Sequence, residues 1–126
     1  CKIVTNTKKF DHVTPLLHKL NWLPVKQLLT LRDSIMMYKC INNLAPTYLT
    51  NKFFKRSDIH DRHTRKRDSL QIPRYKTATG QRTFSYRGTT IWNNLDESIK
   101  QCGSLKKFKK TMKELLFDES FKQLSL

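Results

Sequence analysis

Prolines recur in the first half of the chain and divide it into short helical segments. Pro15, Pro24 and Pro46 each precede a run whose apolar residues recur at helical spacing. A proline is tolerated in the first turn of a helix, where its missing N–H has no partner, but it breaks a helix interior. The pattern therefore predicts three helices within residues 14–54, the longest of them ending at Asn42–Asn43.

The second half combines alternating runs with a final amphipathic stretch. Residues 70–72 and 83–86 alternate apolar and polar side chains on either side of Gly80, a pattern typical of a small β-hairpin. The apolar spacing within residues 89–117 predicts further helices, the last beginning at Ser104. We therefore expect a mainly α fold with a small β-hairpin. The expected parts are a helical part at 14–54, a basic loop at 55–68, short strands at 69–88, helices at 89–117 and a tail at 118–126.

Size and cysteine usage limit the architecture. With 126 residues and 37% hydrophobic content, the chain is expected to form a single compact domain. No stretch of eighteen apolar residues occurs, so no membrane partner is expected. Cys1, Cys40 and Cys102 are odd in number and lack a CxxC spacing, which argues against a disulfide framework. The chain begins with cysteine, so we expect a fragment of a longer protein.

Positive charge is the strongest indication of function. The chain holds 25 Lys and Arg against 10 Asp and Glu, a formal net charge of +15, and residues 51–94 hold 11 of the cations against 3 carboxylates. Aromatic residues interleave with the cations there, and this mixture is typical of surfaces that bind RNA or DNA. The candidate nucleic-acid-binding residues are Arg62, Arg65, Lys66, Arg67, Arg74, Tyr75, Lys76, Arg82, Tyr86 and Arg87. Lysines between 106 and 113 form a second basic face, which either contacts phosphates or is merely solvated.

Catalytic chemistry finds little support in the sequence. The carboxylates are scattered, whereas two-metal catalysis needs them clustered, and three glycines supply no phosphate-binding loop. His60 and His63 are three apart, a spacing that could ligate zinc with Cys40 and Cys102 in a zinc-dependent nuclease. Two solvated histidines fit the basic surroundings better. We therefore expect no catalytic residue, no metal and no cofactor.

Two tryptophans lie beside aliphatic residues. Trp22 is followed by Leu23 and Trp92 is preceded by Ile91. Exposed tryptophans can stack on bases, but an indole flanked by aliphatic side chains is more often part of a core. The sequence therefore predicts core positions for Trp22 and Trp92.

Short motifs run in order along most of the chain. They are Thr5-Asn6-Thr7-Lys8-Lys9-Phe10-Asp11-His12-Val13-Thr14-Pro15, Leu20-Asn21-Trp22-Leu23-Pro24-Val25, Tyr38-Lys39-Cys40-Ile41-Asn42-Asn43-Leu44-Ala45-Pro46-Thr47-Tyr48-Leu49, Ile72-Pro73-Arg74, Arg82-Thr83-Phe84-Ser85-Tyr86 and Ile91-Trp92-Asn93-Asn94-Leu95. Together they resemble the C-terminal region of the reverse transcriptases of LINE-type non-LTR retrotransposons, in the jockey-like group. The resemblance covers residues 3–117 and departs at Asp96, where many relatives carry proline.

The resemblance implies a role within a larger enzyme. In such elements the polymerase palm and the endonuclease precede this region, so the resemblance implies a noncatalytic, thumb-proximal accessory domain of an RNA-directed DNA polymerase. Its implied partners are RNA or DNA and the rest of the polymerase polypeptide, and its implied location is the nucleus, or the cytoplasm as a ribonucleoprotein. The alternative is a structural module that docks on the polymerase thumb without touching nucleic acid.

Overall fold

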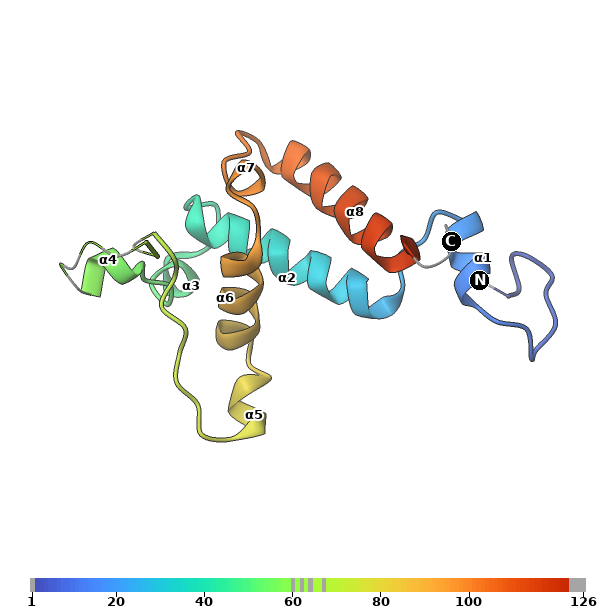
Figure 1. Cartoon of the computed structure of the whole chain (residues 1–126), viewed down its shortest axis with the longest axis horizontal. Helices are drawn as coiled ribbons and strands as arrows, with labels where there is room; N and C mark the ends of the chain where they lie inside the picture. The colour runs from blue at the N-terminus through green and yellow to red at the C-terminus, as the bar shows by residue number, and fades with distance from the viewer. Residues whose placement is uncertain (1, 60, 62, 64, 67, 123–126) are drawn as a thin grey trace.

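The structure is a computed structural model that describes residues 2–122 except 60, 62, 64 and 67. This part of the chain is mainly α-helical, as the sequence predicts (Figure 1). The helices are α1 (Thr14–Lys19), α2 (Val25–Ile41), α3 (Thr47–Thr50), α4 (Arg56–Ile59), α5 (Ala78–Gln81), α6 (Phe84–Asn94), α7 (Glu97–Lys100) and α8 (Leu105–Phe121). None of the described helices is long and apolar enough to cross a membrane.

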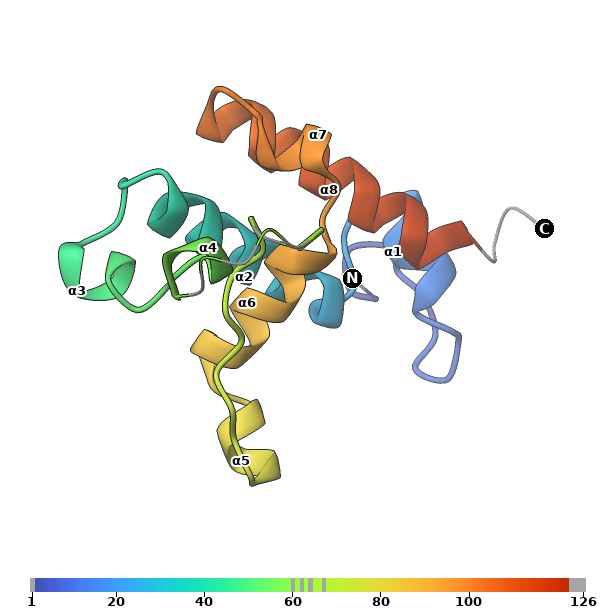
Figure 2. The same ribbon diagram turned by 60° about the vertical axis from the view of Figure 1, so that its left-hand side comes forward.

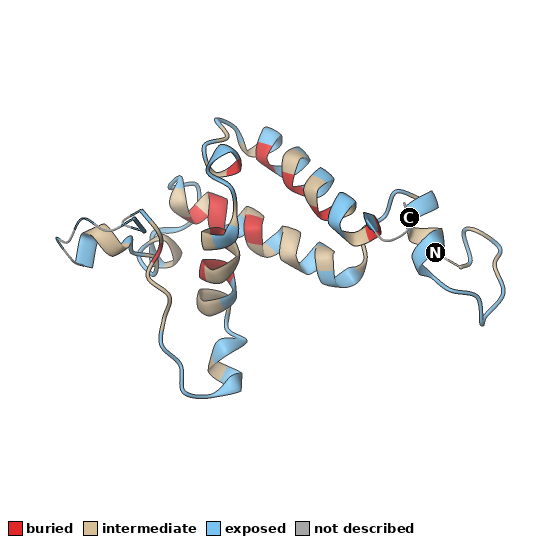
Figure 3. Ribbon diagram, viewed as in Figure 1, coloured by how far each residue is buried: buried red, intermediate tan, exposed pale blue. Residues whose placement is uncertain are grey.

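Helix α2 is the centre of the fold. Helix α8 lies along it in the antiparallel sense, and α6 crosses it (Figures 1 and 2). Buried residues gather where these three helices meet (Figure 3). The core cluster consists of Met37, Tyr38, Leu70, Trp92, Ile99, Phe108, Met112 and Leu116. Burial of these apolar side chains, each worth about 1.5–3 kcal/mol when complete, is the main source of stability.

Phe108 joins the three helices through aromatic contacts. Its ring stacks on Tyr38 of α2, with centroids 4.5 Å apart, and lies 6.1 Å from the ring of Trp92 in α6. The Tyr38 hydroxyl donates a hydrogen bond of 2.6 Å to the carbonyl of Cys102, so the polar end of this buried ring is satisfied. The prediction that Trp92 belongs to the core is confirmed.

Gly88 allows α6 to approach α2 closely. A Cβ atom at this position would lie 2.7 Å from Met37 Sδ and 3.0 Å from Met37 Cγ, and Met37 is completely buried. Next to it, the buried Thr89 hydroxyl donates to the carbonyl of Ser85 in the preceding turn. Only glycine fits this contact without displacement of a core side chain.

Asparagines in the left-handed conformation end the first two helices where the sequence predicts a break. Asn21 has φ 56° and Asn43 has φ 57°. After α2, the amide of Leu44 donates to the carbonyl of Lys39 at 2.8 Å, which satisfies one of the free carbonyls of the last turn. Asparagine adopts this conformation more readily than other non-glycine residues, so it can end a helix where the chain must turn.

The predicted β-hairpin and the strands at 69–88 are wrong. Residues 84–94 form α6, and Leu70 makes an isolated antiparallel bridge with Lys55 instead of pairing with residues 83–86. In place of a strand, Phe84, Gly88 and Trp92 recur four residues apart on the face of α6 that packs toward the core. Four alternating residues are too few to separate a strand from the first turn of a helix.

Three smaller expectations also differ from the structure. The basic loop at 55–68 contains the single-turn helix α4, and α8 continues to Phe121, so residues 118–121 are helical. Phe121 is buried because its ring contacts Phe117 and His18 of α1. The rest of the predicted tail, at 123–126, lies outside the described residues. The core position predicted for Trp22 is wrong, since its side chain is 46% exposed.

Candidate nucleic-acid interface

The basic loop is closed at its base and anchored to the core. The amide of Arg56 donates to the carbonyl of Ser69 at 2.9 Å, and the amide of Gln71 donates to the carbonyl of Phe54 at 2.8 Å. From the other side, Asn93 of α6 accepts from the amide of Leu70 at 2.9 Å and donates to its carbonyl at 3.0 Å. Leu70 is thereby held in the core, and both ends of the loop are fixed.

Two of the four predicted cations in this loop are described. Arg65 and Lys66 are exposed in the turn that follows α4, and the carbonyl of Lys66 accepts from the amide of Ser69. Arg62 and Arg67 lie outside the described residues. The two described side chains project where the loop has almost no apolar side chains, so their charge faces solvent.

The proposed zinc ligands fall only partly within the described residues. His60 lies outside the described residues, and His63 is exposed. Within the described part of the chain, no three His, Cys, Asp or Glu side chains gather in a way that could hold a metal ion. The described geometry therefore adds no support to the zinc alternative.

A second group of predicted residues meets around α5 and the start of α6. The Tyr75 and Tyr86 rings lie edge to face, with centroids 6.4 Å apart. Gly80 of α5 lets the Tyr75 ring pack directly on the backbone, since a Cβ there would lie 2.7 Å from Tyr75 Cβ. Thr77 caps α5 by accepting a hydrogen bond of 3.1 Å from the amide of Gly80. Packing on this short helix thus orients Tyr75 toward Tyr86.

Three exposed cations lie within four residues of Tyr75 or Tyr86 along the chain and have no carboxylate partner among the described residues. They are Arg74, Lys76 and Arg82. Ion pairs in the described part of the chain are confined to Arg87 with Asp33 and Lys100 with Glu97. The charges of the three cations are therefore available to an external anion. We call Tyr75, Tyr86 and these three cations the tyrosine-cation cluster.

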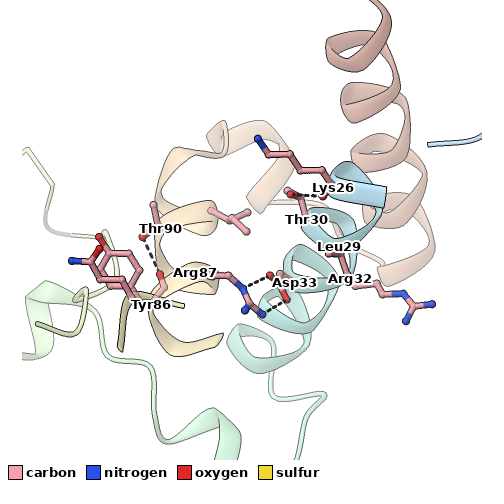
Figure 4. A pocket seen from close by; sticks show the side chains of 10 residues that line it. Lys26, Leu29, Thr30, Arg32, Asp33, Tyr86, Arg87 and Thr90 are labelled. Atoms are coloured by element: carbon pink, nitrogen blue, oxygen red, sulfur yellow. Dashed lines mark hydrogen bonds and ion pairs between the residues drawn. The ribbon is translucent and has the colours of Figure 1, made fainter. Parts of the chain in front are cut away.

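Arg87 is engaged within the fold. Its Nε and Nη2 donate to the two carboxylate oxygens of Asp33 in α2, at 3.0 and 3.3 Å (Figure 4). Its Nη1 donates to the carbonyl of Arg82 at 2.6 Å. Such a two-point contact fixes the planar guanidinium. Arg87 therefore ties α6 to α2, and its charge is largely compensated by Asp33.

A cleft of about 620 Å³ lies between α2 and α6. Lys26, Leu29 and Arg32 line it from α2, beside the pair of Arg87 and Asp33 (Figure 4). No sequence motif marks these α2 residues. The sequence feature that could have indicated them is the presence of apolar residues on more than one face of α2, because packing against the core requires only one apolar face.

The lysines of α8 form a separate basic face. Helix α8 begins at Ser104, whose Oγ accepts from the amide of Lys107 at 3.2 Å, and it buries Phe108, Met112 and Leu116. Its exposed lysines, none in an ion pair among the described residues, are Lys106, Lys107, Lys109, Lys110 and Lys113. Figure 1 places α8 and α5 on opposite sides of α2, so this face is distinct from the tyrosine-cation cluster.

Comparison of the chain with protein-family models, with curated proteins and with solved structures finds no match. Its chemistry is therefore inferred from the geometry of its own side chains. Its described residues combine exposed cations with a tyrosine pair in which Tyr75 is exposed and Tyr86 is half-buried.

Proposed function

We propose that this chain is a noncatalytic nucleic-acid-binding domain. The observation that carries the proposal is the tyrosine-cation cluster, in which Arg74, Lys76 and Arg82 are exposed, have no carboxylate partner among the described residues, and lie within four residues of Tyr75 or Tyr86 along the chain. Cations bind phosphates and release condensed counterions, which supplies affinity for any sequence. Tyrosine faces accept unstacked bases, as in many proteins that bind single-stranded RNA.

The fold supports this proposal because it holds the cluster in place before a ligand arrives. Tyr75 packs on Gly80, and the Arg87–Asp33 pair fixes the start of α6 to α2. Little side-chain freedom is then lost when a base stacks on the tyrosines, and such preorganisation raises affinity. The loop cations Arg65 and Lys66 extend the basic surface beyond the cluster.

The resemblance to LINE-type reverse transcriptases suggests the biological setting. Under this proposal the domain belongs to an RNA-directed DNA polymerase and holds element RNA or an RNA/DNA hybrid against it, in the nucleus or in a ribonucleoprotein. Polymerisation and nicking belong to other regions of that polypeptide. The domain contributes phosphate contacts and base stacking.

The test is removal of the three free cations. The triple variant Arg74→Ala, Lys76→Ala, Arg82→Ala should lower the slope of log affinity against log salt by about 2, at roughly 0.7 per lost contact on a single strand. Fluorescence anisotropy with a labelled single-stranded RNA of about 12 nucleotides, at several salt concentrations, measures this slope. Tyr75→Leu should weaken binding by about tenfold, because stacking is worth about 1–3 kcal/mol per base.

A matched control removes three exposed cations elsewhere. The variant Lys8→Ala, Lys19→Ala, Lys52→Ala has the same net charge, and none of these side chains lies in the cluster. The proposal requires the control to retain most of the wild-type slope. Equal losses in the two triple variants, with no effect of Tyr75→Leu, would show that binding is diffuse attraction to a basic protein.

A further inference from the structure

Helix α2 carries a second apolar face that the described fold leaves open. Its buried residues, among them Met37 and Tyr38, face α6 and α8. On the other side a stripe of residues recurs at alternating spacings of four and three, which places them in one line along the helix. We call this line the α2 stripe, and it consists of Val25, Leu29, Arg32, Met36 and Lys39.

The aliphatic members of the α2 stripe are strongly exposed. Val25 is 73%, Leu29 59% and Met36 37% exposed. A line of exposed apolar side chains on a helix whose opposite face is already packed is typical of an interaction surface. Leu29 also lines the cleft between α2 and α6, where Ile91 adds apolar surface beside it. The stripe and the cleft together offer the apolar anchor points to which an amphipathic helix binds.

We propose that the α2 stripe is a docking surface for an acidic amphipathic helix of a protein partner. The charge of the stripe specifies this occupant. Arg32 and Lys39 interrupt the aliphatic line, Lys26 borders the cleft, and none of them has an ion-pair partner among the described residues. Asp33 is the carboxylate that lines the cleft, and Arg87 already holds it (Figure 4). Glutamates or aspartates beside apolar anchors complement this pattern.

Two other occupants fit the stripe less well. A second copy of the chain would bring Arg32 and Lys39 against the same cations, because the stripe contains no carboxylate. Nucleic acid would find aliphatic side chains, which offer no aromatic face for bases, whereas protein–nucleic acid interfaces are polar and strongly positive. The α2 stripe shares no residue with the tyrosine-cation cluster, but Tyr86 of the cluster lines the cleft beside the stripe, so the experiment must measure peptide binding and RNA binding separately.

The stripe also sets the length of the partner helix. Val25 and Lys39 are fourteen residues apart, which spans about 21 Å at 1.5 Å per residue. A partner helix of about four turns covers this distance. The probe is therefore a labelled synthetic peptide of about 16 residues, with leucines at every third and fourth position and glutamates on both flanks.

The experiment compares this peptide with a scrambled peptide of the same composition. Fluorescence anisotropy should show the amphipathic peptide binding at least about tenfold more tightly than the scrambled one, a ratio that general attraction to a basic protein does not produce. Leu29→Ser should abolish this preference. Because Leu29 is mostly exposed, the variant should keep the wild-type circular dichroism spectrum and denaturation midpoint.

A charge swap provides the sharper test. Arg32→Glu should weaken binding of the glutamate-flanked peptide and strengthen binding of a lysine-flanked version of it. Lys109→Glu makes the same charge change on α8 and should leave the ratio of amphipathic to scrambled peptide affinity unchanged. Equal binding of the amphipathic and scrambled peptides by the wild type overturns the proposal. The proposal is also overturned if Leu29→Ser leaves the peptide preference unchanged and weakens binding of single-stranded RNA. Loss of RNA binding in the Arg74, Lys76 and Arg82 variant with peptide binding intact separates the two proposals.

Discussion

Replacing Gly88 by alanine should destabilise the fold, although alanine is the better helix former. Alanine in place of glycine favours an exposed helix interior by about 1 kcal/mol. At Gly88 the added methyl would lie 2.7 Å from Met37 Sδ, 3.0 Å from Met37 Cγ and 3.2 Å from Phe84 Cε2. Met37 is completely buried and has no open space to move into. Overpacking of this kind costs about 1–3 kcal/mol, so after the propensity gain of about 1 kcal/mol we expect a net loss of up to about 2 kcal/mol.

Gly103 provides a matched control with the opposite sign. A Cβ at Gly103 meets nothing within 4 Å, and its backbone is outside the left-handed region. Gly103→Ala should therefore stabilise the protein by about 0.4–1 kcal/mol, because it restricts the unfolded chain. Urea denaturation followed by far-ultraviolet circular dichroism measures both changes in the free energy of unfolding.

The result that refutes this reasoning is a stable Gly88→Ala variant. If Gly88→Ala and Gly103→Ala both stabilise the protein, then α6 does not approach α2 as closely as the structure shows. A second measurement tests the named contact. In a Met37→Ala background, with sucrose added to favour the folded state, Gly88→Ala should become favourable by about 1 kcal/mol, since the sulfur it would strike is absent.

Three further perturbations test other contacts. Asn93→Ala removes both hydrogen bonds that hold the end of the basic loop and should cost about 2 kcal/mol in urea denaturation, whereas the exposed neighbour Asn94→Ala should stay within about 0.5 kcal/mol. Trp22→Ala should cost less than about 1 kcal/mol, well below the roughly 3–5 kcal/mol of a buried aromatic, and a larger loss would contradict the observed exposure. Burial raises the pKa of the Cys40 thiol, so at mildly alkaline pH iodoacetamide should label the partly exposed Cys102 before Cys40, as read by peptide mass spectrometry. The folded state holds this proton more tightly than the unfolded state, so the contribution of Cys40 to stability should be lost as pH rises past the ordinary thiol pKa.

Local signals in the sequence are sufficient to predict α1, α2 and α3, but not α4. Prolines at helix starts and asparagines at helix ends act on the backbone within a few residues, so their effects are readable without the rest of the fold. The same kind of local signal does not predict the first turn of α6. Its sequence alternates apolar and polar residues over four positions, and Gly88 lowers its helix propensity. Packing against Met37 of α2, which lies far away in sequence, favours the helix.

The environment of Trp22 depends on a turn. Asn21, in the left-handed conformation, redirects the chain between α1 and α2, and the indole lies partly exposed beside Leu28 and Leu31 at that corner. Aliphatic neighbours in sequence gave no information about this direction. The end of α8 likewise depends on a distant contact, because Phe121 is buried against His18 of α1.

The candidate site was predictable in composition but only partly in geometry. Charge and aromatic content point to residues 51–94, and within that segment the structure brings Tyr75 and Tyr86 together, with Tyr75 packed against Gly80. The pairing of Arg87 with Asp33 joins residues 54 positions apart, and no local pattern distinguishes this arginine from its free neighbours. Counting cations therefore identifies a basic segment, whereas separating structural from available cations requires their long-range partners.

The bridge between the exposed Lys55 and the buried Leu70 makes residues 56–69 a closed loop that is anchored to the core at Leu70. The entropy of closing a flexible loop grows only with the logarithm of its length, by about 0.6 kcal/mol for each doubling. Insertions within this loop therefore alter the free energy of folding only slightly, while they change how far its cations reach and how many there are. Selection can adjust the reach of this loop toward a polyanion without repacking α2, α6 and α8.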